Sequence, residues 1–414
     1  MRSSKKALIL LVFLLILHHA NICAQDYYKY FKDTTLRIDY IFSGNARKQY
    51  IALDELHSSN HWYGKRQRLS EVPVEGNGQI TARDHKTGKI IYKNSFSTLF
   101  QEWLSYPEAE KLTRSFENVF LMPMPRDTAD ITIDLYNNRR KITTSMTHTI
   151  APSDILIRHD KTMPYIVLQQ ARDTSRCIHI AYVAEGYQKN EKSTFLADCD
   201  TAIEALFAHE PFKSSRDRFE IIAIIPPSKD SGTSIPSKDI WKDTPLHSNF
   251  DTFYSERYLT TLHLKDLHDL LNGTPYEHII ILVNTSEYGG GGILNSYNLS
   301  MTHHPMFKPV VVHEFGHSFA GLADEYAYEE EQIPMYPADV EPWEKNITTR
   351  VDFKGKWENL LKTDRKAGFY EGAGYSLKGV YRAYPRCRMR DNQYPEFCPA
   401  CRQAIQNVID FYTK

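Results

Sequence analysis

The stretch that decides the fold reads Val310-Val-Val-His-Glu-Phe-Gly-His-Ser-Phe-Ala-Gly-Leu-Ala-Asp-Glu-Tyr326. Its apolar spacing predicts a helix over residues 310–320. Pro309 is tolerated at the start of such a helix. Gly321 suits the left-handed position that follows a helix C-terminus. We therefore expect the helix to end at residue 320, with three residues between it and the acidic pair.

The helix carries His-Glu-x-x-His, with His313 and His317 four residues apart. That spacing places both imidazoles on one helix face. Two such groups bind one Zn²⁺ at about 2.0–2.1 Å. Glu314 then lies beside the metal-activated water, where a general base is needed.

A catalytic zinc usually takes three protein ligands and leaves one position for water. Asp324 is the predicted third ligand, because it follows the turn at Gly321 and offers a carboxylate. Glu325 is the alternative. Whichever of the two does not bind zinc is expected to orient a ligand histidine.

Two further segments could support this site. Tyr288-Gly-Gly-Gly-Gly292 follows a predicted strand and is either a strand edge that pairs with substrate or a flexible loop. Met389 lies in Cys387-Arg-Met-Arg390 and is either part of a Met-containing turn under the zinc or a core gap filler. Residues 326–356 are expected to rim the cleft.

Working outward, residues 27–150 show short alternating strands separated by turn signals, with one helix near residues 95–104. This pattern favours a β-sandwich. The periodicity weakens over residues 151–164. Strands then alternate with helices, which predicts a mixed α/β domain with a largely parallel sheet. The predicted domains are residues 25–155 and 165–414.

The N-terminus has the pattern of a signal peptide. Arg2, Lys5 and Lys6 precede the apolar run from Ala7 to Leu17, and residues 1–24 would be removed near Ala24. Lipidation at Cys23 is the less favoured alternative, because the preceding isoleucine is not small. No later segment is apolar and long enough to span a membrane. The protein is therefore expected to be periplasmic, cell-surface or secreted.

Charge is balanced over the 414 residues, with 50 Lys and Arg against 51 Asp and Glu. There is consequently no bulk electrostatic case for nucleic acid or a membrane surface as a partner. The expected partner is a protein or glycoprotein substrate.

Export changes the interpretation of the cysteines, because disulfides form in oxidising compartments. Five cysteines remain after removal of the leader, and Cys387, Cys398 and Cys401 cluster near the C-terminus. A disulfide within this cluster is expected. The alternative is a structural metal, which would need a fourth ligand that the sequence does not identify.

These motifs resemble the IgA peptidase family of bacterial metallopeptidases. The resemblance covers most of residues 170–414, including Ala184-Glu-Gly-Tyr187 and Phe397-Cys-Pro-Ala-Cys401. It implies a zincin-type catalytic domain with zinc on His313, His317 and the following acid, and Glu314 as base. The front domain resembles the β-sandwich that precedes this domain in some family members. The spacing from His317 to the acid is one residue longer than in related zinc peptidases, so the third ligand stays open.

The expected fold is therefore α+β, with an N-terminal β-sandwich before a zincin-type domain that has a mixed sheet and an active-site helix. The expected function is a zinc peptidase, with zinc-activated water and Glu314 as general base. The alternative is a catalytically inactive protein that binds proteins or glycans on the same scaffold.

Overall fold

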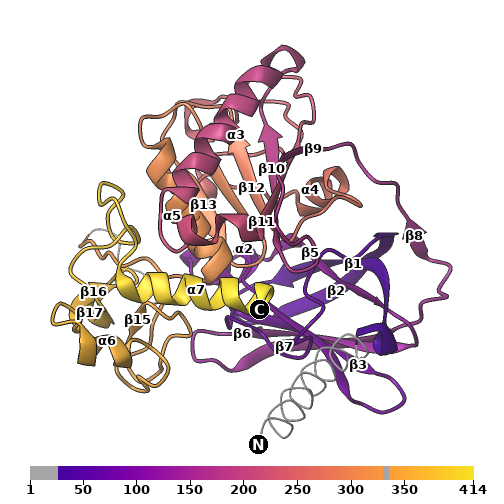
Figure 1. Ribbon diagram of the computed structural model, residues 1–414, viewed down its shortest axis with the longest axis horizontal. Coiled ribbons are helices and arrows are strands. Elements are labelled where there is room, and N and C mark those ends of the chain that lie inside the picture. The colour runs from indigo at the N-terminus through magenta and orange to yellow at the C-terminus, as the bar shows by residue number, and fades with distance from the viewer. Residues whose placement is uncertain (1–26, 330–334) are drawn as a thin grey trace, which may run out of the picture.

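The computed structural model describes residues 27–329 and 335–414 (Figure 1). The predicted signal peptide at residues 1–24 lies outside these ranges. The front half of the chain forms two four-stranded sheets, with strand orders β5-β1-β2-β8 and β4-β3-β6-β7. Their bounds are β1 (Phe31–Gly44), β2 (Gln49–Asn60), β3 (Gly78–Asp84), β4 (Ile90–Phe96), β5 (Arg114–Pro125), β6 (Ala129–Tyr136), β7 (Ile142–Ile150) and β8 (Ile157–His159).

The two front sheets pack face to face through aromatic side chains. Phe96 of β4 and Phe120 of β5 belong to different sheets, and their ring centroids are 4.3 Å apart. Buried and half-buried residues alternate along β6, as expected for a strand with one face on a core. The predicted N-terminal β-sandwich agrees with this arrangement.

The second half contains a six-stranded sheet of order β13-β14-β12-β10-β11-β9. Its four central strands are parallel, and the two edge strands are antiparallel to their neighbours. This is the mixed, largely parallel sheet that the alternating pattern predicts. The strands are β9 (Ile166–Gln169), β10 (Ile178–Glu185), β11 (Phe219–Ile224), β12 (His278–Val283), β13 (Gly290–Ile293) and β14 (Tyr297–Met301).

The two faces of this sheet lie on different cores. Ile180 and Tyr182 of β10 share a core with α3 (Lys192–Phe207), α5 (Phe307–Ala320) and α7 (Pro399–Thr413). The intervening residues Ala181 and Val183 share a core with α4 (Leu264–Leu270) and with the front strands. The front half is thus joined to the sheet by one continuous apolar core.

A smaller sheet of order β15-β17-β16 completes the chain before α7. In Figure 1 it lies beside α6, and α7 runs from it beneath the six-stranded sheet. Its elements are β15 (Ile347–Thr348), α6 (Glu358–Thr363), β16 (Tyr370–Ala373) and β17 (Ser376–Arg382).

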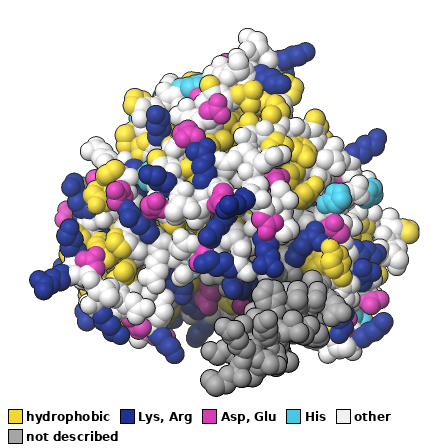
Figure 2. Space-filling model, viewed as in Figure 1, with side chains coloured by type: hydrophobic (Ala, Val, Ile, Leu, Met, Phe, Trp, Pro, Cys, Tyr) yellow, Lys and Arg dark blue, Asp and Glu magenta, His cyan; other side chains and the backbone are white. Residues whose placement is uncertain are grey.

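The face shown in Figure 2 carries Lys and Arg side chains scattered among Asp and Glu. This mixture matches the near-zero net charge of the sequence. Within the described ranges, every helix is too short or too polar to cross a bilayer.

Candidate metal centre and active site

Helix α5 holds the His-Glu-x-x-His motif and ends at the predicted glycine. It begins at Phe307, one turn earlier than expected, so Pro309 lies in the first turn, where a missing N–H costs nothing. Gly321 has φ +58°, and its N–H donates to the carbonyl of His317 at 3.0 Å. This left-handed cap reverses the chain toward Asp324.

Three side-chain atoms converge beside this helix. His313 Nε2 lies 3.0 Å from His317 Nε2 and 3.0 Å from Asp324 Oδ1. The third side of the triangle, from His317 Nε2 to Asp324 Oδ1, is 3.4 Å. Ligands on a tetrahedral zinc at 2.0–2.1 Å would be separated by about 3.3 Å. The residues present therefore fit that metal.

The far nitrogens of both rings are held by backbone carbonyls. His313 Nδ1 donates to Arg388 O at 3.0 Å, and His317 Nδ1 donates to Leu322 O at 2.6 Å. A carbonyl can only accept, so each neutral ring carries its proton on Nδ1 and has a lone pair on Nε2. With both rings neutral, two lone pairs and a carboxylate oxygen at these separations repel one another. Burial lowers the pKa of His317, but the charge of Asp324 raises it to about 9, so either a proton on His317 or a metal cation relieves this repulsion.

The two candidate acids lie in different places. Burial alone would raise the pKa of Asp324, but the charges and hydrogen bonds of His317 and His313 outweigh it and hold that pKa well below its ordinary value. Tyr375 donates to Asp324 Oδ2 at 2.7 Å and so fixes the carboxylate. Glu325 instead points among the C-terminal cysteines. The geometry therefore favours Asp324 as third ligand.

Glu314 faces the cleft one position from the first histidine. Burial raises the pKa of its carboxyl above the ordinary value. A carboxylate with a raised pKa is a better proton acceptor for water, as a general base requires.

A second carboxyl in the cleft was not found by sequence reasoning. Glu102 lies on α2 (Leu99–Trp103) of the front half, and Tyr258 donates to its Oε2 at 2.6 Å. Burial raises the pKa of Glu102 from 4.5 to about 7, despite that hydrogen bond. Glu102 is close enough to Glu314 and Asp324 to interact with them electrostatically. No sequence motif identifies Glu102, because the residues that surround it lie far away along the chain.

Glu102→Gln should flatten the pH dependence of stability in chelator-treated protein. Between pH 4.5 and about 7 the folded state binds more protons at Glu102 than the unfolded chain does. Wild-type stability should therefore fall as the pH rises through this window. In wild type this fall in the free energy of unfolding should be on the order of 1 kcal/mol, a modest value because the carboxyl faces the open cleft. The variant should not show it. Urea unfolding at pH 5 and pH 8 measures this, and equal declines in both proteins would contradict it.

The glycine run is not a loop but the edge strand β13 beside α5. A Cβ at Gly292 would lie 2.2 Å from the carbonyl oxygen of Glu314, and one at Gly290 would lie 2.9 Å from Val310 Cγ1. These glycines are therefore needed for close packing of α5 against β13. Gly290 also forms an isolated β-bridge with Tyr258 on the outer side of β13, which occupies part of this edge. Pairing of substrate with the edge therefore stays a prediction.

Gly292→Ala should destabilise the protein by about 1–3 kcal/mol, the usual range for overpacking. The new methyl group would force α5 away from β13, since backbone atoms cannot rotate aside. Gly368→Ala is the matched control, because its Cβ would meet only the Tyr370 ring at 3.3 Å. Urea unfolding compares the two, and a Gly292→Ala midpoint equal to wild type would refute the packing argument.

Met389 lies under α5. It is fully buried, and a Cβ at Gly316, between the two histidines, would lie 2.8 Å from its sulfur. The preceding carbonyl is the one that holds His313. The structure thus places this turn where the interpretation as a Met-containing support requires it.

The site opens into a cleft of about 1240 Å³. Both halves of the chain form its walls. Described residues between 326 and 344 contribute, whereas residues 345–356 do not, so the expected rim over residues 326–356 is confirmed only in its first part. The aromatic residues that line it include Tyr106, Tyr136, Tyr258, Tyr326, Tyr336, Trp343 and Tyr375. This volume exceeds the roughly 300–1,000 Å³ of pockets for small molecules, so a polypeptide segment would fit.

The expected disulfide is absent. All five cysteines in the described ranges are free, and Cys387 Sγ lies 3.6 Å from Cys401 Sγ. A disulfide requires about 2.05 Å. The Glu325 carboxylate also reaches into the cluster, with Oε1 3.0 Å from Cys401 Sγ.

Comparison with known families agrees with this organisation. Residues 166–366 match the family model described as IgA Peptidase M64, and residues 26–147 match the model described as Peptidase M64 N-terminus. No curated protein matches the chain. The first match contains His313, Glu314, His317 and Asp324. Because the two matches cover most of its length, the chain belongs to the IgA peptidase M64 family, a family of peptidases.

Proposed function

We propose that this protein is an exported zinc-dependent peptidase that hydrolyses peptide bonds of extracellular proteins or glycoproteins. The observation that carries the proposal is the convergence of two Nε2 atoms and Asp324 Oδ1 within 3.4 Å, beside Glu314 and at the cleft. Export rests on the sequence of residues 1–24 alone.

In the proposed mechanism His313, His317 and Asp324 hold the metal. When bound there, zinc would polarise the scissile carbonyl and make water acidic enough to deprotonate near neutral pH. Glu314 accepts the proton of the attacking water and then donates it to the nitrogen of the leaving amine. The carbonyls of Arg388 and Leu322 keep both rings oriented throughout.

The cleft supports an extended peptide segment as the bound part of the substrate. Its walls offer aromatic faces and charged groups of both signs, including Arg140, Arg257 and Glu102. Such a lining suits mixed polar and apolar side chains rather than one charged polymer.

The direct test is hydrolysis by the purified full chain of a casein and of a mucin-type glycoprotein, with products identified by mass spectrometry. We expect new peptide termini, loss of cleavage with 1,10-phenanthroline, and recovery on addition of Zn²⁺. Binding without cleavage at full zinc occupancy would instead favour an inactive protein- or glycan-binding function.

A further inference from the structure

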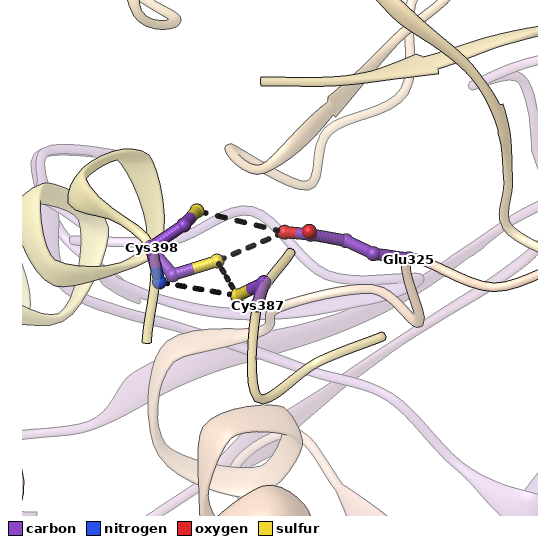
Figure 3. Close-up of side chains that lie close together, drawn as sticks. Glu325, Cys387 and Cys398 are labelled. Carbon is purple, nitrogen blue, oxygen red and sulfur yellow. Dashed lines mark hydrogen bonds between the residues drawn. The ribbon is translucent and has the colours of Figure 1, made fainter. Parts of the chain in front are cut away.

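A second set of metal-type ligands lies outside the catalytic triangle. One ligand atom from each of Glu325, Cys387, Cys398 and Cys401 lies within 4.8 Å of the others. All four residues are buried, and the most exposed, Cys398, is 3% accessible. Figure 3 shows Glu325, Cys387 and Cys398 pointing toward one another from three separate segments of the chain.

The distances match a tetrahedral zinc and not a disulfide. Two sulfurs bound to zinc at about 2.3 Å would lie about 3.8 Å apart, and a bound sulfur and oxygen about 3.5 Å apart. Cys387 Sγ and Cys401 Sγ are 3.6 Å apart. Glu325 Oε1 lies 3.0 Å from Cys401 Sγ and 3.9 Å from Cys398 Sγ.

Among the described residues no cation forms an ion pair with Glu325, and Arg382 acts on its carboxyl only as a nearby charge. Glu325 Oε2 is buried and has no hydrogen-bond partner among the described residues. Its Oε1 receives Asn346 Nδ2 at 3.1 Å, and the remaining neighbours are sulfurs, which are weak donors. An unpaired carboxylate in such a place is costly, whereas coordination to a cation would satisfy it.

Local backbone geometry also favours thiolates here. Cys398 caps the N-terminus of α7, a helix of 15 residues whose dipole stabilises negative charge at that end. The Cys398 N–H donates to Cys387 Sγ at 3.2 Å. Cys398-Pro-Ala-Cys401 has the Cys-x-x-Cys spacing found in structural zinc sites.

We propose that Glu325, Cys387, Cys398 and Cys401 bind a structural zinc ion separate from the catalytic one. This second site goes beyond the proposed peptidase activity. Glu325 is the fourth ligand that the sequence did not identify.

This zinc would fasten together the two segments that support the active site. Glu325 directly follows Asp324, and its N–H donates to Met389 O at 2.8 Å. Cys387 directly precedes the residue whose carbonyl holds His313. A cation bound by Glu325 and Cys387 would therefore fix the third catalytic ligand relative to the first.

The test uses the full chain purified under reducing conditions and loaded with Co²⁺, whose bonds to thiolates give a charge-transfer absorption in the near ultraviolet. This absorption should persist in His313→Ala/His317→Ala and disappear in Cys401→Ser. Cys199→Ala removes a buried thiol of α3 outside the cluster and should keep it. Zinc content should fall by one equivalent in Cys401→Ser and stay at the wild-type value in Cys199→Ala.

A measurement on wild-type protein covers the case in which Cys401→Ser does not fold. Zinc X-ray absorption should then show sulfur neighbours at about 2.3 Å. Zinc bound only by nitrogen and oxygen, or a disulfide between two of the three cysteines in intact protein, would overturn the proposal. Neither result would count against the proposed catalytic site. Conversely, zinc–sulfur bonds in a protein that does not hydrolyse peptides would support the structural zinc and contradict only the proposed peptidase function.

Discussion

Glu314→Gln is expected to abolish peptide hydrolysis while leaving the metal in place. The amide keeps the size of the side chain but cannot accept the proton of water at neutral pH. Loss of a general base typically costs about 10²–10⁴ in rate, and we expect kcat/KM to fall within or beyond that range. Glu314 is not one of the three side chains that converge on the proposed metal site, so zinc content should be unchanged.

The measurement is kcat/KM on a cleaved peptide, with zinc determined by mass spectrometry in the same sample. Glu358→Gln, an exposed change at the start of α6, is the control and should behave as wild type. Full activity in Glu314→Gln would show that another group accepts the proton.

His317→Ala should remove one zinc equivalent relative to wild type and abolish hydrolysis. The variant deletes one of the three atoms that converge on the site and leaves Asp324 with its hydrogen bonds to His313 and Tyr375. A site with two ligands binds zinc far more weakly than one with three. If the cysteine cluster holds its own ion, the variant should retain that one.

His85→Ala serves as the control, because His85 is exposed and pairs with Asp130 in the front half. It should keep both the zinc content and the activity of wild type. Unchanged zinc in His317→Ala would place the metal elsewhere, and the proposed mechanism would then be wrong.

The sequence predicted the features that depend on neighbours along the chain. Helical spacing predicted α5, and the need for a left-handed residue predicted its end at Gly321. Period-two alternation predicted β6 and the front sheets. The His313 and His317 pair is likewise local, since one helix turn brings the two rings together.

The remaining features depend on contacts between distant segments. Glu102 is placed at the site by the packing of the front half, and Tyr375 reaches Asp324 from a residue 51 positions away. Glu185, to which the sequence assigned no role, is fully buried and accepts a hydrogen bond from the Leu246 N–H at 3.0 Å. The disulfide prediction was wrong, and no local pattern indicates that Glu325 enters the cysteine cluster from 62 residues before Cys387.

The continuous core between the front sheets and the six-stranded sheet bears on how such a protein can be modified. A front half that shared only a linker with the rest could be exchanged as a cassette. Here an exchange of the front half would replace Glu102 in the cleft wall. It would also replace apolar side chains that share a core with Ala181 and Val183. Altering specificity therefore calls for substitutions of residues that line the cleft, with both halves of the chain otherwise unchanged.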